Sequence, residues 1–371
     1  MYVKFKDSTF LKMSDETITM SHSGIADELK HDSDIMWKLF WGIVAGLITF
    51  AIYKFIAKRS LKPTKVTSKG KMKSNLQRKA TEDILSSVYS SSRFQAARMR
   101  RTSVLVKTLG INNPTKDFEK IADNFHTVEE VSNALKTAGV DSSNLIFGID
   151  FTKSNLYTGR FTFDGHSLHH LDEQNLNPYQ RVISILGKTL APFDKDGLIP
   201  AFGFGDNVTE DKRVFPFKSN ETYCNGFEEV LDIYNQTVPK VELGGPTDFA
   251  PLIREAIRIV EKSGEFHILV IIGDGQVTAE RRTQDAIVEA SHYPLSIIMV
   301  GVGDGPWEIM EEFDDKLPKR KFDNFQFVHF ESVVVNAEFP EATFALNALM
   351  EVPDQFKEIK NQGLLGRKVA E

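Results

Sequence analysis

The chain has 371 residues, of which 41% are apolar and 26% charged, and its formal net charge is −6. This length accommodates one large domain with additional segments, and the apolar content suffices for a sizeable core. A single cysteine, Cys224, excludes a disulfide framework, a zinc ribbon and a RING finger, because each of these needs several cysteines. We expect Cys224 to be a reduced thiol in a cytosolic domain.

The first segment, residues 1–34, is polar and mildly acidic, and we expect it to be a poorly ordered tail. Its start does not resemble a cleavable signal peptide, since the first apolar run comes too late in the chain.

Residues 35–56 contain an apolar run that carries no charge between Leu39 and Tyr53. At about 1.5 Å per residue, the stretch is long enough to cross the hydrocarbon core of a bilayer. Lys38 and Lys54 stand near its ends, where long side chains reach the headgroups. A buried core helix or an interfacial helix is the alternative, but no polar face occurs at helical spacing. We therefore predict one transmembrane helix.

A basic linker, residues 57–118, is expected after this helix, and the charged residues of segment 54–79 are all basic. The positive-inside rule then predicts a single-pass membrane protein whose remaining domain lies on the cytoplasmic side. We also expect the basic segment to bind anionic lipid headgroups. Binding to nucleic acid is not expected, because no aromatic stacking platform or helix-turn-helix pattern accompanies the basic residues.

Residues 119–362 alternate between strand-like apolar runs and helical patterns, which predicts a doubly wound α/β domain with a mostly parallel, Rossmann-like sheet. A turn or hairpin is expected over residues 155–165, and a closing helix over residues 342–361 that is interrupted at Pro353. The predicted strands cover residues 145–149, 198–204, 265–272, 295–302 and 325–330. The predicted helices cover residues 128–138, 178–190, 226–234, 248–261, 279–291 and 307–313.

A candidate metal site begins at Asp150, which ends the first buried strand and is followed at alternate positions by the hydroxyls of Thr152 and Ser154. This spacing presents three oxygens to one point, which suits a hard divalent cation such as Mg²⁺ or Mn²⁺. Ligands bind at this edge of open α/β sheets. Taken alone the spacing is weak evidence, because a capped turn after a strand uses the same residue types.

Two later segments strengthen the metal interpretation. Thr247 ends a tight Gly-Gly-Pro turn before a helical pattern, and Asp274 follows a second buried strand. In this order the three pieces resemble the metal-ion-dependent adhesion site (MIDAS) of a von Willebrand A domain.

The resemblance extends well beyond these residues, over roughly residues 120–350, in the stretches NLIFGIDFTKSN, LIPAFGFGD, CNGFEEVL, GGPTDFAPLI, VIIGDGQVT, PLSIIMVGVGDGPW and FDNFQFVHF. Together these stretches resemble the A domain of copines. Plant copine-like RING-domain ubiquitin ligases carry the same type of domain.

This resemblance implies that one divalent ion lies among Asp150, Thr152, Ser154, Thr247 and Asp274. The ion would be Mg²⁺ or Mn²⁺, with Ca²⁺ as a further candidate. The resemblance also implies that the open position of the ion accepts an acidic side chain of a partner protein, and that the chain is not an enzyme. The family more often has Ser at the position of Thr152, where the chain keeps the hydroxyl and adds a methyl group.

Other candidate residues are weaker. Asp206 follows a Gly-rich strand end; we expect it either to support the ligands from behind or to lie at the rim of the site, and it is not one of the predicted ligands. His169 and His170 lack the spacing of metal ligands, so we expect a solvated or packed role for each. The turn at residues 301–306 lacks the spacing of a phosphate-binding loop.

The function expected from these features is that of a membrane-anchored cytosolic adaptor whose A domain binds partner proteins through the metal. A substrate-recruiting component of a ubiquitin-ligase system is the first alternative, by analogy with the RING-bearing relatives. A calcium-responsive, copine-like trafficking or signalling protein is the second. The linker is too short for the lipid-binding modules that copines carry in pairs.

Overall fold

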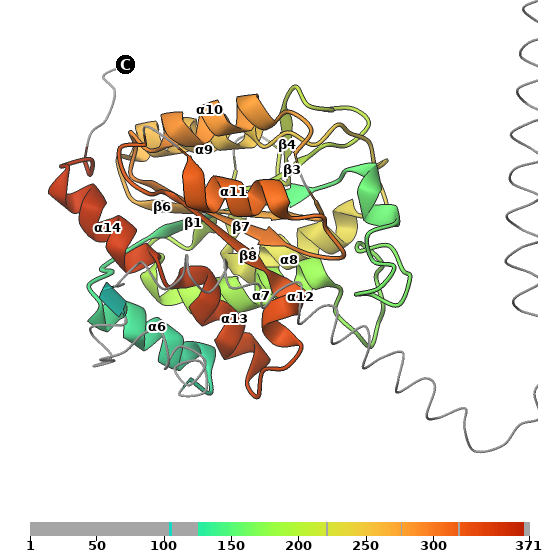
Figure 1. The fold of residues 1–371 in the computed structure, drawn as a ribbon, viewed down its shortest axis with the longest axis horizontal. Coiled ribbons are helices and arrows are strands. Elements are labelled where there is room, and N and C mark those ends of the chain that lie inside the picture. Colours follow the sequence, from blue (N-terminus) through green and yellow to red (C-terminus); the bar gives the residue numbers. More distant parts are fainter. Residues whose placement is uncertain (1–103, 106–124, 220–221, 276, 318–319, 367–371) are drawn as a thin grey trace, which may run out of the picture. The chain divides into compact units, whose positions relative to one another are not determined.

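A six-stranded sheet with the order β4-β3-β1-β6-β7-β8 forms the centre of the computed structural model, which describes residues 104–105, 125–219, 222–275, 277–317 and 320–366 (Figure 1). The parallel strands are β3 (Ala201–Phe204), β1 (Asn144–Asp150), β6 (His267–Gly273), β7 (Leu295–Gly301) and β8 (Phe325–His329). Only β4 (Val214–Pro216) pairs antiparallel within this sheet, with β3. The expected α/β architecture with a mostly parallel sheet is confirmed.

Helices cover both faces of the sheet. One face packs against α9 (Ala250–Ser263), α10 (Glu280–Ala290) and α11 (Glu308–Lys316). The other packs against α6 (Val128–Thr137), α7 (Pro178–Leu190), α8 (Gly226–Thr237), α12 (Phe330–Val334), α13 (Pro340–Leu349) and α14 (Val352–Asn361). Alternate side chains of each central strand enter opposite cores, as Val270 and Leu269 of β6 do. Burial on both faces explains why these strands are continuous apolar runs.

Local signals explain where the helices begin and end. Before α7, Asn177 and Gln180 form a reciprocal capping box, and Pro178 occupies the first turn, where a missing amide proton costs nothing. Helix α9 ends at Gly264, whose φ of 67° is the left-handed conformation that glycine adopts most easily.

Proline explains one difference from the predicted elements and accounts for the predicted interruption of the closing helix. The strand expected over residues 198–204 divides at Pro200, and β2 (Leu198–Ile199) pairs instead with β5 (Cys224–Asn225) in a separate two-stranded sheet. Proline lacks the amide proton that a continuous ladder would need. The closing helix is two helices, α13 and α14, with Pro353 in the first turn of α14.

Residues 155–165 form turns, the first alternative of the predicted turn or hairpin: the 3₁₀ helix η1 (Lys153–Leu156) leads into them. A second 3₁₀ helix, η2 (Ala191–Phe193), extends the end of α7. The antiparallel edge strand β4 was not predicted, because its three residues are too short to show a period of two.

Strand β1 lies at the switch point of the sheet, between β3 and β6. The chain leaves β1 through α7 on one face and enters β6 through α9 on the other face. Connections that diverge to opposite faces leave a crevice at the carboxyl ends of these strands, where ligands of doubly wound folds bind.

The single-pass membrane location expected from the sequence is contradicted: over the ranges that the structure describes, no helix is long and apolar enough to cross a bilayer. Residues 35–56, on which that expectation depended, lie outside the described residues, as do the amino-terminal tail and most of the basic linker.

Candidate metal site at the carboxyl edge of the sheet

Asp150, the last residue of β1, is fully buried and only half satisfied by hydrogen bonds. Its Oδ1 atom accepts a hydrogen bond of 2.7 Å from the amide of Thr152, whereas Oδ2 has no hydrogen-bond partner among the described residues. Burial raises the pKa of this carboxyl well above its usual value, and the nearby charge of Asp274 raises it further. A buried carboxylate in this state is strongly stabilised by a cation.

Hydrogen bonds through Thr152 and Ser154 connect Asp150 to Asp274, which follows β6. The Ser154 hydroxyl donates to Oδ1 of Asp274 at 2.9 Å, and its oxygen lies 2.9 Å from the hydroxyl of Thr152. Since Ser154 uses its only proton on Asp274, the Thr152 hydroxyl is the donor between the two. Burial raises the pKa of Asp274 to about 6. The oxygens of Asp150, Thr152, Ser154 and Asp274 are here called the oxygen cluster. Ser154 itself is exposed, so the cluster opens to solvent on this side.

Two glycines leave room around the Asp150 carboxylate. A Cβ atom at Gly273 would lie 3.1 Å from Oδ2 of Asp150, the oxygen without a partner. A Cβ atom at Gly205, whose φ is +75°, would lie 2.4 Å from the methyl group of Thr152. The extra methyl of threonine therefore packs over Gly205 and not into the oxygen cluster.

The turn that carries Thr247 is attached to the same edge. Gly244 forms a parallel bridge with Thr152, and its carbonyl accepts a 2.8 Å hydrogen bond from the amide of Lys153. Thr247 is buried, and its carbonyl accepts a 2.8 Å hydrogen bond from the amide of Thr278. Within the described ranges, direct side-chain contacts join Thr152 to Ser154 and Ser154 to Asp274, whereas the Thr247 side chain makes no hydrogen bond to them.

Two neighbouring carboxylates form hydrogen bonds or an ion pair with groups outside the oxygen cluster. Asp206 accepts hydrogen bonds from the amides of Val208 and Thr209, both at 3.1 Å, and so forms its own turn. Asp248 accepts a 2.8 Å hydrogen bond from the amide of Ala250 in the first turn of α9, and its Oδ2 lies 3.1 Å from the guanidinium of Arg282. Both carboxylates therefore stabilise loops beside the oxygen cluster.

A buried histidine, His169, lies behind the cluster in the packed role that was one of the two expected for it, but its contact with Asp150 was not predicted. The Nε2 atom of His169 lies 2.8 Å from the carbonyl of Asp150, and Nδ1 lies 2.8 Å from the hydroxyl of Tyr234 on α8. Burial lowers the pKa of His169 to about 4, so the ring is neutral near pH 7. Nε2–H therefore donates to the carbonyl, and Nδ1 accepts from the tyrosine. The ring stacks between Phe151 and Tyr179, with centroids 4.9 and 4.3 Å away.

A second buried contact holds Asn155, which directly follows Ser154. The Tyr179 hydroxyl of α7 donates to Oδ1 of Asn155 at 2.6 Å, and the Asn155 amide donates to the carbonyl of Thr152 at 3.1 Å. Helices α7 and α8 thus fix the backbone of Asp150 and of Thr152 through buried side chains. No local pattern in the sequence distinguishes His169 from the exposed His170 beside it.

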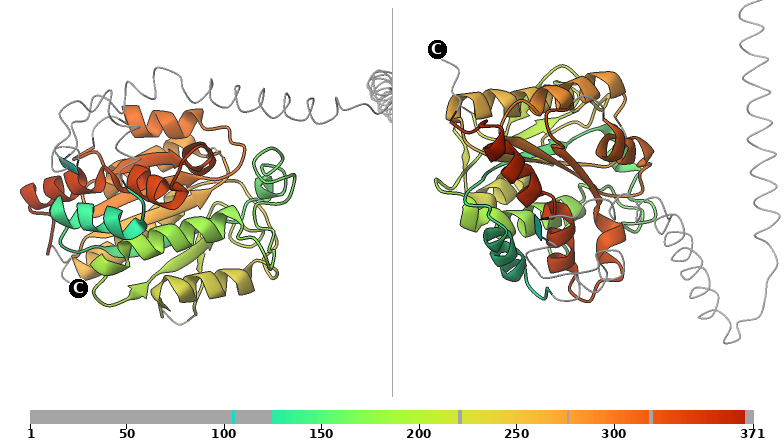
Figure 2. Two further views of the ribbon diagram at one scale, coloured as in Figure 1. Left: turned by 90° about the horizontal axis from the view of Figure 1, so that it is seen from below. Right: turned by 60° about the vertical axis from the view of Figure 1, so that its left-hand side comes forward.

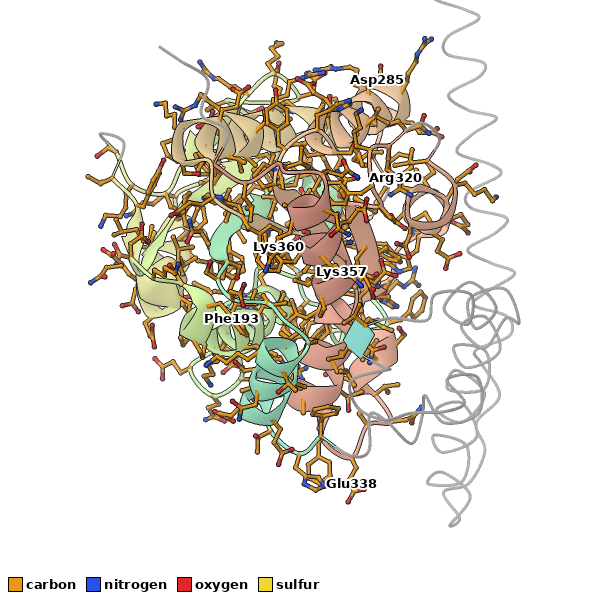
Figure 3. All side chains as sticks on the ribbon, turned by 90° about the vertical axis from the view of Figure 1, so that its left-hand side faces the viewer. Phe193, Asp285, Arg320, Glu338, Lys357 and Lys360 are labelled. Carbon is orange, nitrogen blue, oxygen red and sulfur yellow. The ribbon has the colours of Figure 1, made fainter. Side chains whose placement is uncertain are left out.

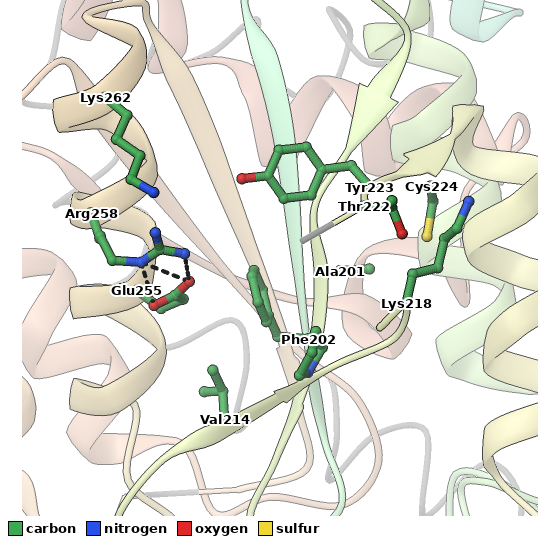
Figure 4. Close-up of a pocket in the computed structure, with 11 residues that line it drawn as sticks. Ala201, Phe202, Val214, Lys218, Thr222, Tyr223, Cys224, Glu255, Arg258 and Lys262 are labelled. Atoms are coloured by element: carbon green, nitrogen blue, oxygen red, sulfur yellow. Dashed lines mark hydrogen bonds and ion pairs between the residues drawn. The ribbon is translucent and has the colours of Figure 1, made fainter. Parts of the chain in front are cut away.

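A cavity of about 230 Å³ lies elsewhere, between α9 and β4 (Figure 4). Its lining includes Ala201 of β3 and Val214 of β4, and none of the five predicted metal ligands. The Arg258 guanidinium at its wall contacts Glu255 at 3.0 Å, and the Lys218 ammonium contacts Glu229 at 2.9 Å. Because these charges already have partners, we assign no ligand to this cavity.

No cluster of three or more His, Cys, Asp or Glu side chains that could hold a metal occurs in the described part of the chain. The cluster at the end of β1 differs in kind, since it combines two carboxylates with hydroxyls. Mg²⁺ keeps several of its waters and needs only one or two carboxylates, so such a sparse set of oxygens fits it.

Comparison with known proteins shows that the chain is similar to copines and to plant ubiquitin ligases. The family model described as Copine matches residues 167–368, slightly more than half of the chain. Copine family protein 2 of Caenorhabditis elegans is 54% identical over 270 residues, covering 72% of this chain and 3% of that protein. E3 ubiquitin-protein ligase RGLG5 of Arabidopsis thaliana is 53% identical over 272 residues, covering 69% of this chain and 63% of the ligase. The chain thus spans only part of the length of these relatives.

Similar solved structures include a von Willebrand factor type A protein from Catenulispora acidiphila, with a TM-score of 0.36 and 13% identity, covering 56% of this chain and 43% of that chain. The manganese-loaded TRAP protein of Plasmodium vivax has a TM-score of 0.36 and 11% identity, covering 56% of this chain and 72% of that chain.

The expectation that the chain is not an enzyme is contradicted by the comparison with curated proteins. Relatives that are more than half identical over the aligned region are named as E3 ubiquitin-protein ligases. The sequence-based expectation depended on how A domains in general act, whereas these relatives combine the same domain with a named enzymatic activity.

Proposed function

Because the chain belongs to the copine family, we propose that its A domain binds partner proteins through a divalent cation held at the carboxyl edge of the sheet. The proposed ligands are Asp150, Thr152, Ser154, Thr247 and Asp274, some of them acting through water. When bound, the cation supplies an electrophilic coordination position for a carboxylate of the partner.

The single observation that supports this proposal most strongly is the buried Oδ2 atom of Asp150, which has no hydrogen-bond partner in the described part of the chain. An ionised carboxylate oxygen that is buried without a partner lowers the stability of the fold by several kcal/mol unless a cation or a hydrogen-bond donor neutralises it. This cost is on the order of the whole stability of a domain. The oxygens around Oδ2 come from carboxylates and hydroxyls, which favour Mg²⁺ or Mn²⁺, with Ca²⁺ as the alternative ion.

Calorimetric titration of Mg²⁺ and of Mn²⁺ into the full chain tests the metal site. We expect binding by the wild type, its loss in Asp150→Ala, and weaker binding in Thr247→Ala. The control is Asp285→Ala, which removes an exposed carboxylate on α10 and leaves affinity unchanged (Figure 3). A folded wild type that binds neither ion, or an Asp150→Ala variant that binds as tightly as the wild type, would refute the proposal.

A second function is favoured by the 53% identity to a named plant ubiquitin ligase. We infer that the A domain presents its partner proteins to a ubiquitin-transfer reaction. A reconstituted assay with ubiquitin-activating and ubiquitin-conjugating enzymes, ATP and the full chain measures ubiquitin incorporation. Incorporation that requires the chain and falls in Asp150→Ala supports this function, whereas incorporation that is the same without the chain contradicts it.

A further inference from the structure

An exposed apolar surface adjoins the oxygen cluster. It belongs to the loop of residues 156–168, here called the rim loop, which starts two residues after Ser154. Three of its large apolar side chains face solvent: Leu156 is 40% exposed, Tyr157 69% and Phe161 71%. Figure 2 shows this loop, coloured green, projecting beyond the carboxyl ends of the strands. Several large exposed apolar side chains within six residues of one loop favour an interaction site there.

The rim loop is held firmly by hydrogen bonds. The Asp304 carboxylate, from the loop after β7, accepts from the amides of Phe161 and Thr162 at 3.0 Å each and from the Thr162 hydroxyl at 2.8 Å. The Asp304 amide in turn donates to the carbonyl of Thr158 at 2.7 Å. A surface that is ordered before binding loses little conformational entropy on binding, so its exposed aromatic side chains are effective anchors.

The rim loop is continuous with the oxygen cluster. The Thr158 hydroxyl donates to Oδ2 of Asp274 at 2.5 Å, while Ser154 donates to Oδ1 of the same carboxylate. Thr158 directly follows Tyr157 in the chain. A protein segment that reached the cluster would therefore pass close to Tyr157.

Two of the three charged residues in and beside the rim loop are basic. Between residues 153 and 168 these are Lys153, Arg160 and the acidic Asp164, all of them exposed. The Arg160 guanidinium lies 5.3 Å from the ring centroid of Phe161, so cation and aromatic surface are presented together. This combination favours a partner segment that is both acidic and apolar.

We propose that the rim loop selects the partner: it binds a protein segment in which a large apolar side chain lies within a few residues of an acidic one. The acidic side chain enters the oxygen cluster, and the apolar side chain packs on Tyr157 and Phe161. The first half of this statement rests on the proposed function, whereas the apolar contact is a separate property of the rim loop.

Selection of random peptides displayed on phage tests the proposal, with the full chain immobilised in Mg²⁺ or in EDTA. The double variant Tyr157→Ser, Phe161→Ser removes the aromatic surface. Val335→Ser is the matched control, because Val335 is 61% exposed and lies at the end of α12, outside the rim loop. Asp150→Ala tests the cluster. Recovered peptides are synthesised, and their affinities are measured by fluorescence polarisation.

We expect the wild type in Mg²⁺ to enrich peptides that pair an acidic with a large apolar residue. These peptides should bind the double variant at least about tenfold more weakly and bind Val335→Ser with unchanged affinity. Peptides that share only an acidic residue and bind the double variant normally would overturn the inference and leave the proposed function intact. Peptides that bind equally in EDTA and to Asp150→Ala, or no enrichment at all, would overturn both.

Discussion

Replacing His169 with phenylalanine isolates the role of the buried hydrogen bonds behind the oxygen cluster. Phenylalanine keeps a flat ring between Phe151 and Tyr179 but removes both nitrogen atoms. The carbonyl of Asp150 then loses a 2.8 Å hydrogen bond, and the Tyr234 hydroxyl loses its 2.8 Å acceptor. Each loss in a buried site costs about 1–3 kcal/mol, so we expect a decrease of roughly 2–6 kcal/mol in the free energy of unfolding.

The same change is expected to weaken Mg²⁺ binding, because the backbone carbonyl of Asp150 no longer receives the hydrogen bond from His169 that holds it in place. Losing a side chain that orients a metal ligand typically lowers metal affinity by about 10–100-fold. Urea unfolding in EDTA measures the first effect, and calorimetric titration of Mg²⁺ into the folded variant measures the second. His170→Phe is the matched control, since His170 is the adjacent residue and is exposed.

Two outcomes would refute this reasoning. Unchanged stability would mean that the two hydrogen bonds contribute nothing in the folded state. Reduced stability with unchanged Mg²⁺ affinity would mean that His169 stabilises the fold without orienting Asp150. His169→Gln, which keeps one donor group, is expected to give intermediate values for both quantities.

Three further predictions follow from the same contacts. Gly273→Ala should lower Mg²⁺ affinity about tenfold in calorimetry, because the added Cβ lies 3.1 Å from Oδ2 of Asp150; unchanged affinity would exclude this oxygen as a ligand. Cys224 is buried and its pKa is raised to about 11, so its alkylation by iodoacetamide at mildly alkaline pH should be roughly a hundredfold slower in folded than in urea-unfolded protein, and equal rates would contradict this burial. Burial lowers the pKa of His267, so the folded protein binds its proton less well than the unfolded chain does. The stability contributed by the neutral ring is therefore present above a pH of about 6.5 and is lost as the pH falls below it. Urea unfolding of wild type and His267→Gln should show a stability difference that changes across this pH range, and a constant difference would refute the assignment.

The sequence by itself determined the layered α/β architecture. The apolar runs that became β1, β6 and β7 are long enough, and apolar enough at every position, to be buried on both faces, and that property is local to each run. The positions of Asp150 and Asp274 directly after two such runs are equally local. Their placement at the carboxyl edge follows from the parallel sheet alone.

Only the tertiary structure decided which groups meet at that edge. Ser154 reaches Asp274 because β1 and β6 are neighbours in the sheet, although 120 positions separate the two residues. His169 reaches the carbonyl of Asp150 because α7 and α8 pack together over one face of the sheet and leave its ring enclosed. The rim loop is ordered by Asp304, which lies 143 positions from Phe161 in the sequence. Strand order and helix packing depend on the burial of apolar surface over the whole domain, which no short pattern encodes.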